Sequence, residues 1–375
     1  MGGDETTLSI CRNLFASCAF GLRQERYIAR AEPDIRQGDA LVLSLTRSGS
    51  DPAPDGDYGL FAVEYAYNST VSWDALGATP FYSGINNRKV NLNSEDKLVF
   101  NAGSSNPPYP YRYPINDFLS VFLYYPYSAA VTPVSIPVAR EVKKDVSNNI
   151  IADKYPDYLG GGKAISVIAG TPEAVPSDNT IVPLKHLMAR VHFRIKNPVE
   201  SAFTLTYVEL KGVTWQGAIN PQIKTSEGFF TPVGSSEDLM LIRDEGVTIY
   251  GTPTGNTVEP QYIPIAPKYN YSDSEAGAAA PAYYDPTSGY SYYMLVPPLI
   301  EADLSDIILE ITVSRSGSTT THTIEMKQPE ILTWEPGKSY CYTINFNSFP
   351  IEEVFGTIED WLEDLFISEP IGMIP

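Results

Sequence analysis

The chain has 375 residues, of which 43% are hydrophobic and 19% are charged, and its formal net charge is −19. This length favours two domains over one, and the negative charge argues against binding of nucleic acid through its phosphates. Tyr (25) and Pro (31) are abundant whereas Met (6) and His (3) are scarce, a composition that predicts an all-β protein. No run of about 18 or more apolar residues occurs, so we expect no membrane-spanning helix.

The N-terminal region contains two of the three cysteines, Cys11 and Cys18. Cys18 follows the sequence LFAS at 14–17, which is similar to a bacterial lipobox, whereas Arg12 interrupts the apolar stretch that a secretion signal would need. Two interpretations therefore stay open, in which Cys18 either carries a lipid or is incidental. The third cysteine, Cys341, lies in a predicted strand and is expected to be a small buried residue.

Residues 40–46, ALVLSLT, are the first predicted strand. Alternate positions form one apolar face, which is the period of two that marks a half-buried strand: Leu41, Leu43 and Leu45. Arg47 ends this strand, and the loop SGSDPAPDGD at 48–57 favours an exposed, protease-accessible turn. One interpretation is an ordinary first strand followed by a loop. The other is a detachable strand, whose removal by cleavage at Arg47 leaves an apolar groove for another chain's strand.

Alternating or continuous apolar patterns predict more strands along the chain: 59–67, 118–125, 184–198, 203–210, 307–313 and 340–346. The nearly all-apolar run FLSVFLYY at 118–125 is typical of a central strand covered on both faces. A hairpin is predicted between 307–313 and 319–326 across the sequence RSGS. Residues 126–185, which include the stretch Gly160–Gly162, are expected to be long connections. A helical turn or two is expected at Ser235–Ile242, and 358–366 is ambiguous.

The segment 184–198 has the clearest alternation, and we place a domain boundary just before it, near residue 184. Its second face is polar and is expected to meet solvent: His186, Met188, Arg190, His192, Arg194 and Lys196. His186 and His192 would lie about 20 Å apart on one strand, so they cannot share a metal ion. We expect them to be surface histidines without a chemical role.

No constellation of residues supports catalysis. The sequence Gly160-Gly161-Gly162-Lys163 lacks the spacing of a phosphate-binding loop. No G-x-S-x-G nucleophile elbow is present, and the many acidic pairs have no spacing suited to general acid–base work. We therefore predict a protein that is not an enzyme, with no catalytic residue, no cofactor and no metal site.

Tyrosine-rich and proline-rich clusters at 107–114 and 281–293 admit two interpretations. Such clusters commonly cover a sandwich edge or cap a core, and they can also stack on sugars. An exposed platform for a glycan would come from the second cluster: Tyr283, Tyr284, Tyr290, Tyr292 and Tyr293.

The C-terminal tail, residues 362–375, has an apolar face made of Leu365, Ile367, Ile371 and Met373, which Glu369 interrupts. The tail is either a last strand within its own sheet or a donor strand for the next subunit. Burial of these anchors at about 1.5–3 kcal/mol each would contribute about 6–12 kcal/mol to a subunit contact, before ordering costs.

Three features in this order resemble the fimbrillin family, the type V pilins of Bacteroidetes. They are the strand, Arg47, loop and GLFAVEYAY order over 40–67, the strand LKHLMARVHFRIKNP at 184–198, and WEPGKSYCYTINFN at 334–347 followed by IEDW at 358–361. The resemblance covers about residue 18 to residue 375.

The resemblance implies two transthyretin-like β-sandwich domains in tandem, with Greek-key-type sheets and few short helices. A leader or propeptide at 1–47 would precede an N-terminal domain at 48–183 and a C-terminal domain at 184–375. The resemblance also implies export as a lipoprotein, with the lipid on Cys18 anchoring the precursor in the outer membrane. An arginine-specific surface protease would then cleave at Arg47, and residues 362–375 would be the donor strand.

The expected function is thus a structural subunit of a cell-surface fimbria that polymerises with copies of itself or related subunits. Such a fimbria would support adhesion to a host or bacterial surface glycan or protein. Other arginines are rival cleavage sites: Arg23, Arg26, Arg30 and Arg36. Tip or anchor subunits of the family can lack cleavage or strand donation. The alternative function is a monomeric glycan-binding surface lipoprotein of β-sandwich type.

Overall fold

The computed structural model describes most of the chain between residues 41 and 360. The described ranges are 41–47, 56–65, 81–93, 97–100, 111–113, 118–144, 150–154, 157–166, 181–221, 227–242, 246–263, 284–285, 290–291, 293–346 and 351–360. All of them belong to one structural unit, Asp34–Pro375. Within these ranges strands dominate, and the helical elements are one short α-helix, α1 (Glu301–Leu304), and one 3-10 turn, η2 (Tyr82–Gly84). The predicted all-β class is confirmed.

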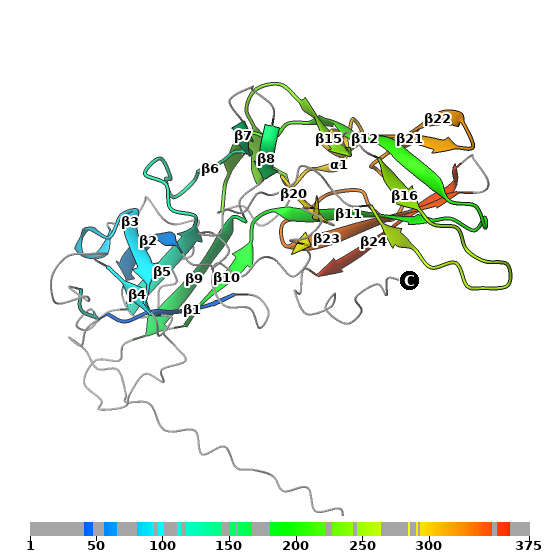
Figure 1. Cartoon of the computed structure of the whole chain (residues 1–375). Helices are drawn as coiled ribbons and strands as arrows, with labels where there is room; N and C mark the ends of the chain where they lie inside the picture. Colours follow the sequence, from blue (N-terminus) through cyan, green and yellow to red (C-terminus); the bar gives the residue numbers. More distant parts are fainter. Residues whose placement is uncertain are drawn as a thin grey trace, which may run out of the picture. The chain divides into compact units, whose positions relative to one another are not determined.

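The first sheet has seven strands (Figure 1). In spatial order they are β1 (Ser44–Arg47), β10 (Ile181–His186), β9 (Leu159–Ser166), β5 (Phe118–Tyr125), β2 (Asp57–Tyr65), β3 (Arg88–Leu92) and β4 (Leu98–Val99). β5 pairs antiparallel with β2 on one side and with β9 on the other. Side chains on both of its faces are buried, Val121 on one and Phe122 on the other, as its continuous apolar run predicts.

β9 corrects the expectation of long connections at 126–185. The segment Gly160–Gly162 is not a loop, because it pairs with β5 in the middle of the first sheet. A Cβ atom on Gly161 would lie 1.9 Å from the carbonyl oxygen of Pro183 in β10. Glycine therefore lets β10 approach β9 more closely than any side chain would allow.

Two further sheets share one apolar core. The first of them contains β17 (Gln261–Tyr262), β11 (Ala189–Lys196), β23 (Lys338–Phe346) and β24 (Ile351–Asp360), with β20 (Met294–Val296) also paired to β11. The second contains β15 (Glu237–Ile242), β12 (Phe203–Val213), β21 (Ile308–Arg315) and β22 (Ser318–Glu325), with β16 (Val247–Ile249) also paired to β12. Their apolar faces meet in one buried cluster, in which the Phe203 and Phe346 rings lie 5.0 Å apart.

Shorter strands complete the described part of the chain. β6 (Ile136–Val138), β13 (Gly217–Ile219) and β14 (Phe230–Pro232) form a three-stranded sheet. β7 (Glu141–Lys144) pairs with β8 (Ile150–Lys154), and β18 (Tyr284–Asp285) pairs with β19 (Tyr290–Ser291).

The segment that begins at Trp334 ties β23 to the chain between β10 and β11. The fully buried indole of Trp334 donates from Nε1 to the Tyr342 hydroxyl at 2.9 Å, and that hydroxyl donates to the Met326 carbonyl at 2.7 Å. Burial raises the pKa of Tyr342, which keeps the hydroxyl a neutral donor. Gly337 has a φ of 70° and donates its backbone N–H to the Met188 carbonyl at 2.9 Å.

The predicted hairpin is confirmed, and the predicted helical turn is wrong. β21 and β22 pair in continuous register from Ile308 and Glu325 to Arg315 and Ser318. The turn between them has positive φ at Ser316 (51°) and Gly317 (82°), as a tight two-residue hairpin requires. Residues 237–242 form strand β15 because they pair with β12, and residues 358–360 are the end of strand β24.

Sheet membership changes between β10 and β11, at Leu187 and Met188. The expected boundary near residue 184 thus falls inside β10, and β6 from the N-terminal half pairs with β13 from the C-terminal half. The division into transthyretin-like domains at 48–183 and 184–375, with Greek-key sheets, stays a prediction.

The close approach of β9 and β10 predicts unequal costs for two neighbouring glycines. We expect Gly161→Ala to lower the free energy of unfolding by about 3 kcal/mol, because its methyl group would overlap a backbone carbonyl. Gly160→Ala is the matched control and should cost under about 1 kcal/mol, because its methyl group would meet only the movable side chain of Leu187. Urea denaturation of both variants measures the difference. Equal costs would contradict the close approach.

Candidate functional site: a strand between two sheet edges

The segment Leu41–Arg47 places its leucines in the core of the first sheet. Leu41 and Leu43 have no exposed surface and Leu45 is 7% exposed, whereas Val42 and Ser44 between them are half-buried. The predicted alternation over this strand is therefore confirmed. The three leucines belong to a buried cluster with residues of β2, β5 and β10, including Leu60, Leu123 and Leu184.

The backbone of this segment bonds to two different sheet edges. Its C-terminal half, β1, pairs parallel with β10 from Ser44 and Ile181 to Arg47 and Leu184. Its N-terminal half contacts the opposite end of the same sheet, where Leu98 at the start of β4 donates its N–H to the Leu43 carbonyl at 2.9 Å. Ser44 and Lys97 form an antiparallel bridge there. One short strand thus connects β10 to β4.

The residues Tyr111–Tyr113 hold the N-terminal half of the segment. Leu41 donates its N–H to the Tyr111 carbonyl at 2.9 Å, and the buried Tyr113 donates its hydroxyl proton to the Val42 carbonyl at 2.9 Å. The Tyr82 hydroxyl in turn donates to the Arg112 carbonyl at 2.6 Å. The N-terminal half is therefore anchored to a loop as well as to β4.

Burial of three leucine side chains contributes about 5–9 kcal/mol as an upper estimate. Loss of the strand would therefore leave a deep apolar groove with unpaired backbone groups on both sides. An extended segment with apolar residues at alternate positions is the ligand that such a groove accepts.

The other predicted site residues lie mostly outside the described residues. These are Cys18, the rival arginines 23, 26, 30 and 36, and the tail residues Leu365, Ile367, Ile371 and Met373. Arg47 is the last residue of β1, so its backbone is placed and its side chain is not described.

The first half of the polar face of β11 is buried and Arg194 and Lys196 are half-buried, which corrects the expectation of a solvent-exposed face. Arg190 is 2% and His192 is 5% exposed. Arg190 donates from Nε to the Ser339 hydroxyl at 3.1 Å, and its guanidinium lies 5.4 Å from the centre of the Tyr293 ring. The covering ring comes from a distant segment, so alternation along β11 alone could not reveal this burial.

The histidines also differ from the expectation of surface residues on one strand. His186 ends β10, is buried, and contacts the Asp157 carboxylate through Nδ1 at 2.9 Å. His192 lies on β11 beside the Tyr262 ring, and burial together with Arg190 and Arg194 lowers the pKa of His192 to about 3. Among the described residues, no group of three or more His, Cys, Asp or Glu side chains could hold a metal ion.

The glycan platform has one described side chain, Tyr293, which is half-buried and packs under Arg190. Tyr284 and Tyr290 are placed only as backbone in β18 and β19, and Tyr283 and Tyr292 lie outside the described residues. Tyr293 therefore does not act as an exposed stacking surface.

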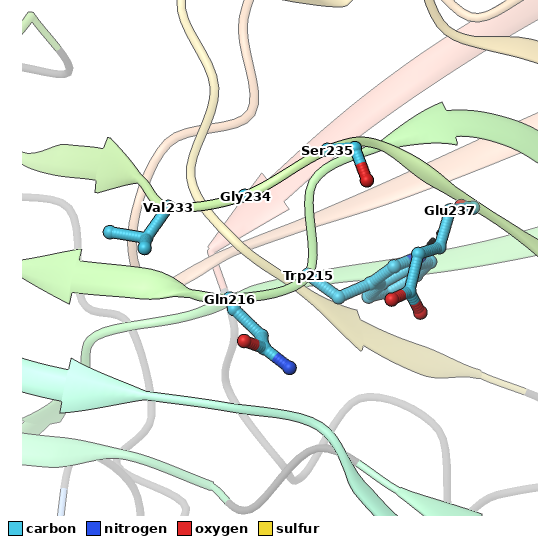
Figure 2. A pocket seen from close by; sticks show the side chains of 6 residues that line it. All are labelled: Trp215, Gln216, Val233, Gly234, Ser235 and Glu237. Carbon is cyan, nitrogen blue, oxygen red and sulfur yellow. Dashed lines mark hydrogen bonds between the residues drawn. The ribbon is translucent and has the colours of Figure 1, made fainter.

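A small cavity of about 160 Å³ lies between the connections that follow β12 and β14. Figure 2 shows its lining residues: Trp215, Gln216, Val233, Gly234, Ser235 and Glu237. The indole is buried and donates from Nε1 to the Glu237 carbonyl at 3.0 Å, while the Glu237 carboxylate lies 3.6 Å from the Arg140 guanidinium. The indole and the Glu237 carboxylate thus each have a partner, and the lining residues include no His or Cys.

The described residues contain no helix with the length and apolar character needed to cross a membrane. The fold is all-β, and its first strand contacts both edges of the first sheet. The chain matches the model of the fimbrillin-like family over residues 65–361. It therefore belongs to the fimbrillin-like family, as the three sequence features predicted.

Several solved structures are similar to the chain. A Bacteroides uniformis protein assigned to cell adhesion shares 14% identity over 86% of this chain and 98% of that chain, with a TM-score of 0.48. A Bacteroides ovatus protein assigned to cell adhesion shares 14% identity over 87% of this chain and 99% of that chain, with a TM-score of 0.44. The tip fimbrial protein Mfa3 of Porphyromonas gingivalis shares 12% identity over 88% and 100%, with a TM-score of 0.37. No curated protein matches.

The burial of the first strand predicts a contrast between two adjacent positions. Leu43→Ala should lower the free energy of unfolding by about 2–5 kcal/mol, because it opens a cavity in the core of the first sheet. Val42→Ala, at a half-buried position, should cost under about 1 kcal/mol. Urea denaturation compares the two variants, and a smaller cost for Leu43→Ala than for Val42→Ala would contradict the placement of the strand.

The buried His192 predicts a pH dependence of stability. Because its folded pKa of about 3 lies below the ordinary value of 6.5, the unfolded chain binds the extra proton and stability falls as the pH falls through that interval. Between pH 7 and pH 5 the wild type should lose about 2 kcal/mol more free energy of unfolding than His192→Gln. Urea titrations at both pH values measure this difference, and equal losses in the two proteins would contradict the burial of a neutral imidazole.

Proposed function

We propose that this protein is a structural subunit of a cell-surface fimbria that polymerises by protease-triggered strand exchange. Membership in the fimbrillin-like family supports the fimbrial class. The single observation that carries the mechanism is the strand at 41–47, which fills one core with leucines and joins β10 to β4. Removal of this strand would create an acceptor with the length, polarity and depth to hold another strand.

Cleavage after Arg47 would be the trigger. The cut would fall at the end of β1, directly before a sequence of small and polar residues at 48–55, a composition that proteases cut readily. The fragment 1–47 would then be held only by non-covalent contacts, namely its leucines, the β10 ladder and the Tyr113 hydrogen bond. A lipid on Cys18 would keep that fragment at the outer membrane while the remaining subunit enters the fimbria.

The donor would be the C-terminal segment 362–375 of a neighbouring copy or a related subunit. Its anchors at 365, 367, 371 and 373 lie on one face as two pairs with Glu369 between them, and they would supply the apolar side chains at the leucine positions. If the rest of the first sheet keeps its shape after the first strand leaves, only the donor would need to become ordered on binding. The resulting fimbria would support adhesion.

Two variants test the cleavage site and the donor separately. Treatment of the wild type with an arginine-specific protease should give a new N-terminus at Ser48 and a ladder of oligomers on an unheated denaturing gel. Arg47→Gln should abolish both, because the scissile bond at Ser48 loses its arginine. Arg36→Gln is the matched control and should leave both unchanged.

Deletion of residues 362–375 should leave cleavage at Arg47 intact and abolish the ladder, because the acceptor would have no donor. If the ladder of oligomers still forms after this deletion, residues 362–375 are not the donor strand. If Arg47→Gln forms the ladder as readily as the wild type, cleavage at Arg47 is not the trigger of polymerisation.

A further inference from the structure

β22 is the outermost strand of its sheet, and little covers it. The order β15-β12-β21-β22 places it at an edge, and within the described ranges no strand pairs with its outer side. Most of its side chains are exposed, including the consecutive residues Ser318–Thr321. β22 therefore presents a row of backbone hydrogen-bonding groups to another molecule.

The edge at β22 lacks the features that usually protect an edge strand. Natural edges are blunted by lysine, proline, inward charges, bulges or short length. β22 has the sequence STTTHTIE, pairs with β21 without a register shift, and carries its single acidic residue at its end. By contrast, β15 begins with Glu237 and Asp238, and β24 contains four acidic residues. Among these three strands, β22 has the fewest charged side chains that would oppose pairing with a strand of another molecule.

Side chains alternate between the two faces of β22. Thr319, Thr321 and Thr323 lie on the outer face, where the Thr321 hydroxyl is 2.9 Å from the Thr312 hydroxyl of β21. His322 and Ile324 lie on the core side, with the His322 ring 5.6 Å from the Phe346 ring. The outer face of this edge thus carries three threonines, with Glu325 following them at the end of the strand. Threonine has high strand propensity and pairs favourably with itself across strands.

We propose that β22 pairs antiparallel with β22 of a second copy of this chain, with the two-fold axis at Thr321. An axis perpendicular to the sheet places residues of the same face opposite each other. Thr321 then lies opposite its counterpart, and Thr319 lies opposite Thr323. No like charges meet in this register, even though the chain carries a net charge of −19, because Glu325 extends past Ser318 of the partner copy.

Neighbouring registers are less favourable. An axis at His322 would place two imidazoles directly opposite each other, and an axis at Thr320 would leave Ile324 without a partner. The pairing at Thr321 joins two sheets of this type edge to edge. It uses a strand remote in sequence from both 41–47 and 362–375, so it does not depend on cleavage or strand exchange.

Disulfide trapping tests the register on the uncleaved full chain with Cys11 and Cys18 replaced by serine. Thr321→Cys should form a disulfide-linked dimer under mild oxidation, because opposite residues of an antiparallel pair have Cα atoms about 4.5–5.5 Å apart. Thr323→Cys is the matched control on the same face. Its two copies would be offset by about 13 Å along the strands, which is too far for a disulfide.

The double variant with cysteines at 319 and 323 should restore the cross-link, because those positions face each other. Equal cross-linking of both single variants, or of neither, would overturn the proposed register. All these experiments use uncleaved protein, so a failure of strand exchange would not affect them.

Sedimentation equilibrium provides a second readout. Thr321→Lys should raise the apparent dissociation constant of the dimer at least about tenfold, since two ammonium groups would meet at the axis. Thr231→Lys, at an exposed position on β14, should leave the constant unchanged. A wild-type chain that sediments as a monomer at every concentration would overturn the proposal.

Discussion

The first sheet depends on one strand that serves two edges. β10 at one end and β4 at the other both form backbone contacts with the segment 41–47, and the same segment supplies three leucines to the core between them. Without it, two rows of peptide groups and an apolar groove would face water together. Unpaired backbone groups and exposed apolar surface each carry a large free-energy cost, so the sheet requires some strand in this place.

This constraint explains why a replacement must match the groove in two respects. Leucines on alternate positions satisfy the core, and backbone groups on both sides of the strand satisfy β10 and β4. A purely apolar ligand would leave the edges unpaired, and a polar extended peptide would leave the core empty. The glycine at 161 adds a third restriction, because it fixes how closely β10 lies against β9 and hence the position of the β10 edge.

Patterns of short period were sufficient to predict many of the strands. The alternation in 41–45, the apolar run of β5 and the turn at Ser316-Gly317 all predicted local structure that the fold confirms. The partners of the first strand could not be predicted, since nothing in its sequence specifies a parallel ladder with β10 or a bridge to Lys97. β9 was mistaken for a loop because glycines usually indicate turns. Here Gly161 is required by the close approach of β10 instead. Arg190 and His192 were mistaken for surface residues because the rings that lie against them belong to remote segments.

The edge strands of the sheets differ in how many acidic residues they carry, and this difference affects how subunits would assemble. Acidic residues on β15 and β24 repel a second copy in a chain of net charge −19, whereas the threonines of β22 do not. Strand exchange would place its contacts in the first sheet and its core, so its strength would depend little on salt. Pairing through β22 would bring two negatively charged chains close to each other. Salt weakens their repulsion, because the Debye length is about 8 Å at physiological ionic strength. Added salt should therefore favour association through β22 while leaving an exchanged strand unaffected, and this difference separates lateral contacts from those along a fimbria.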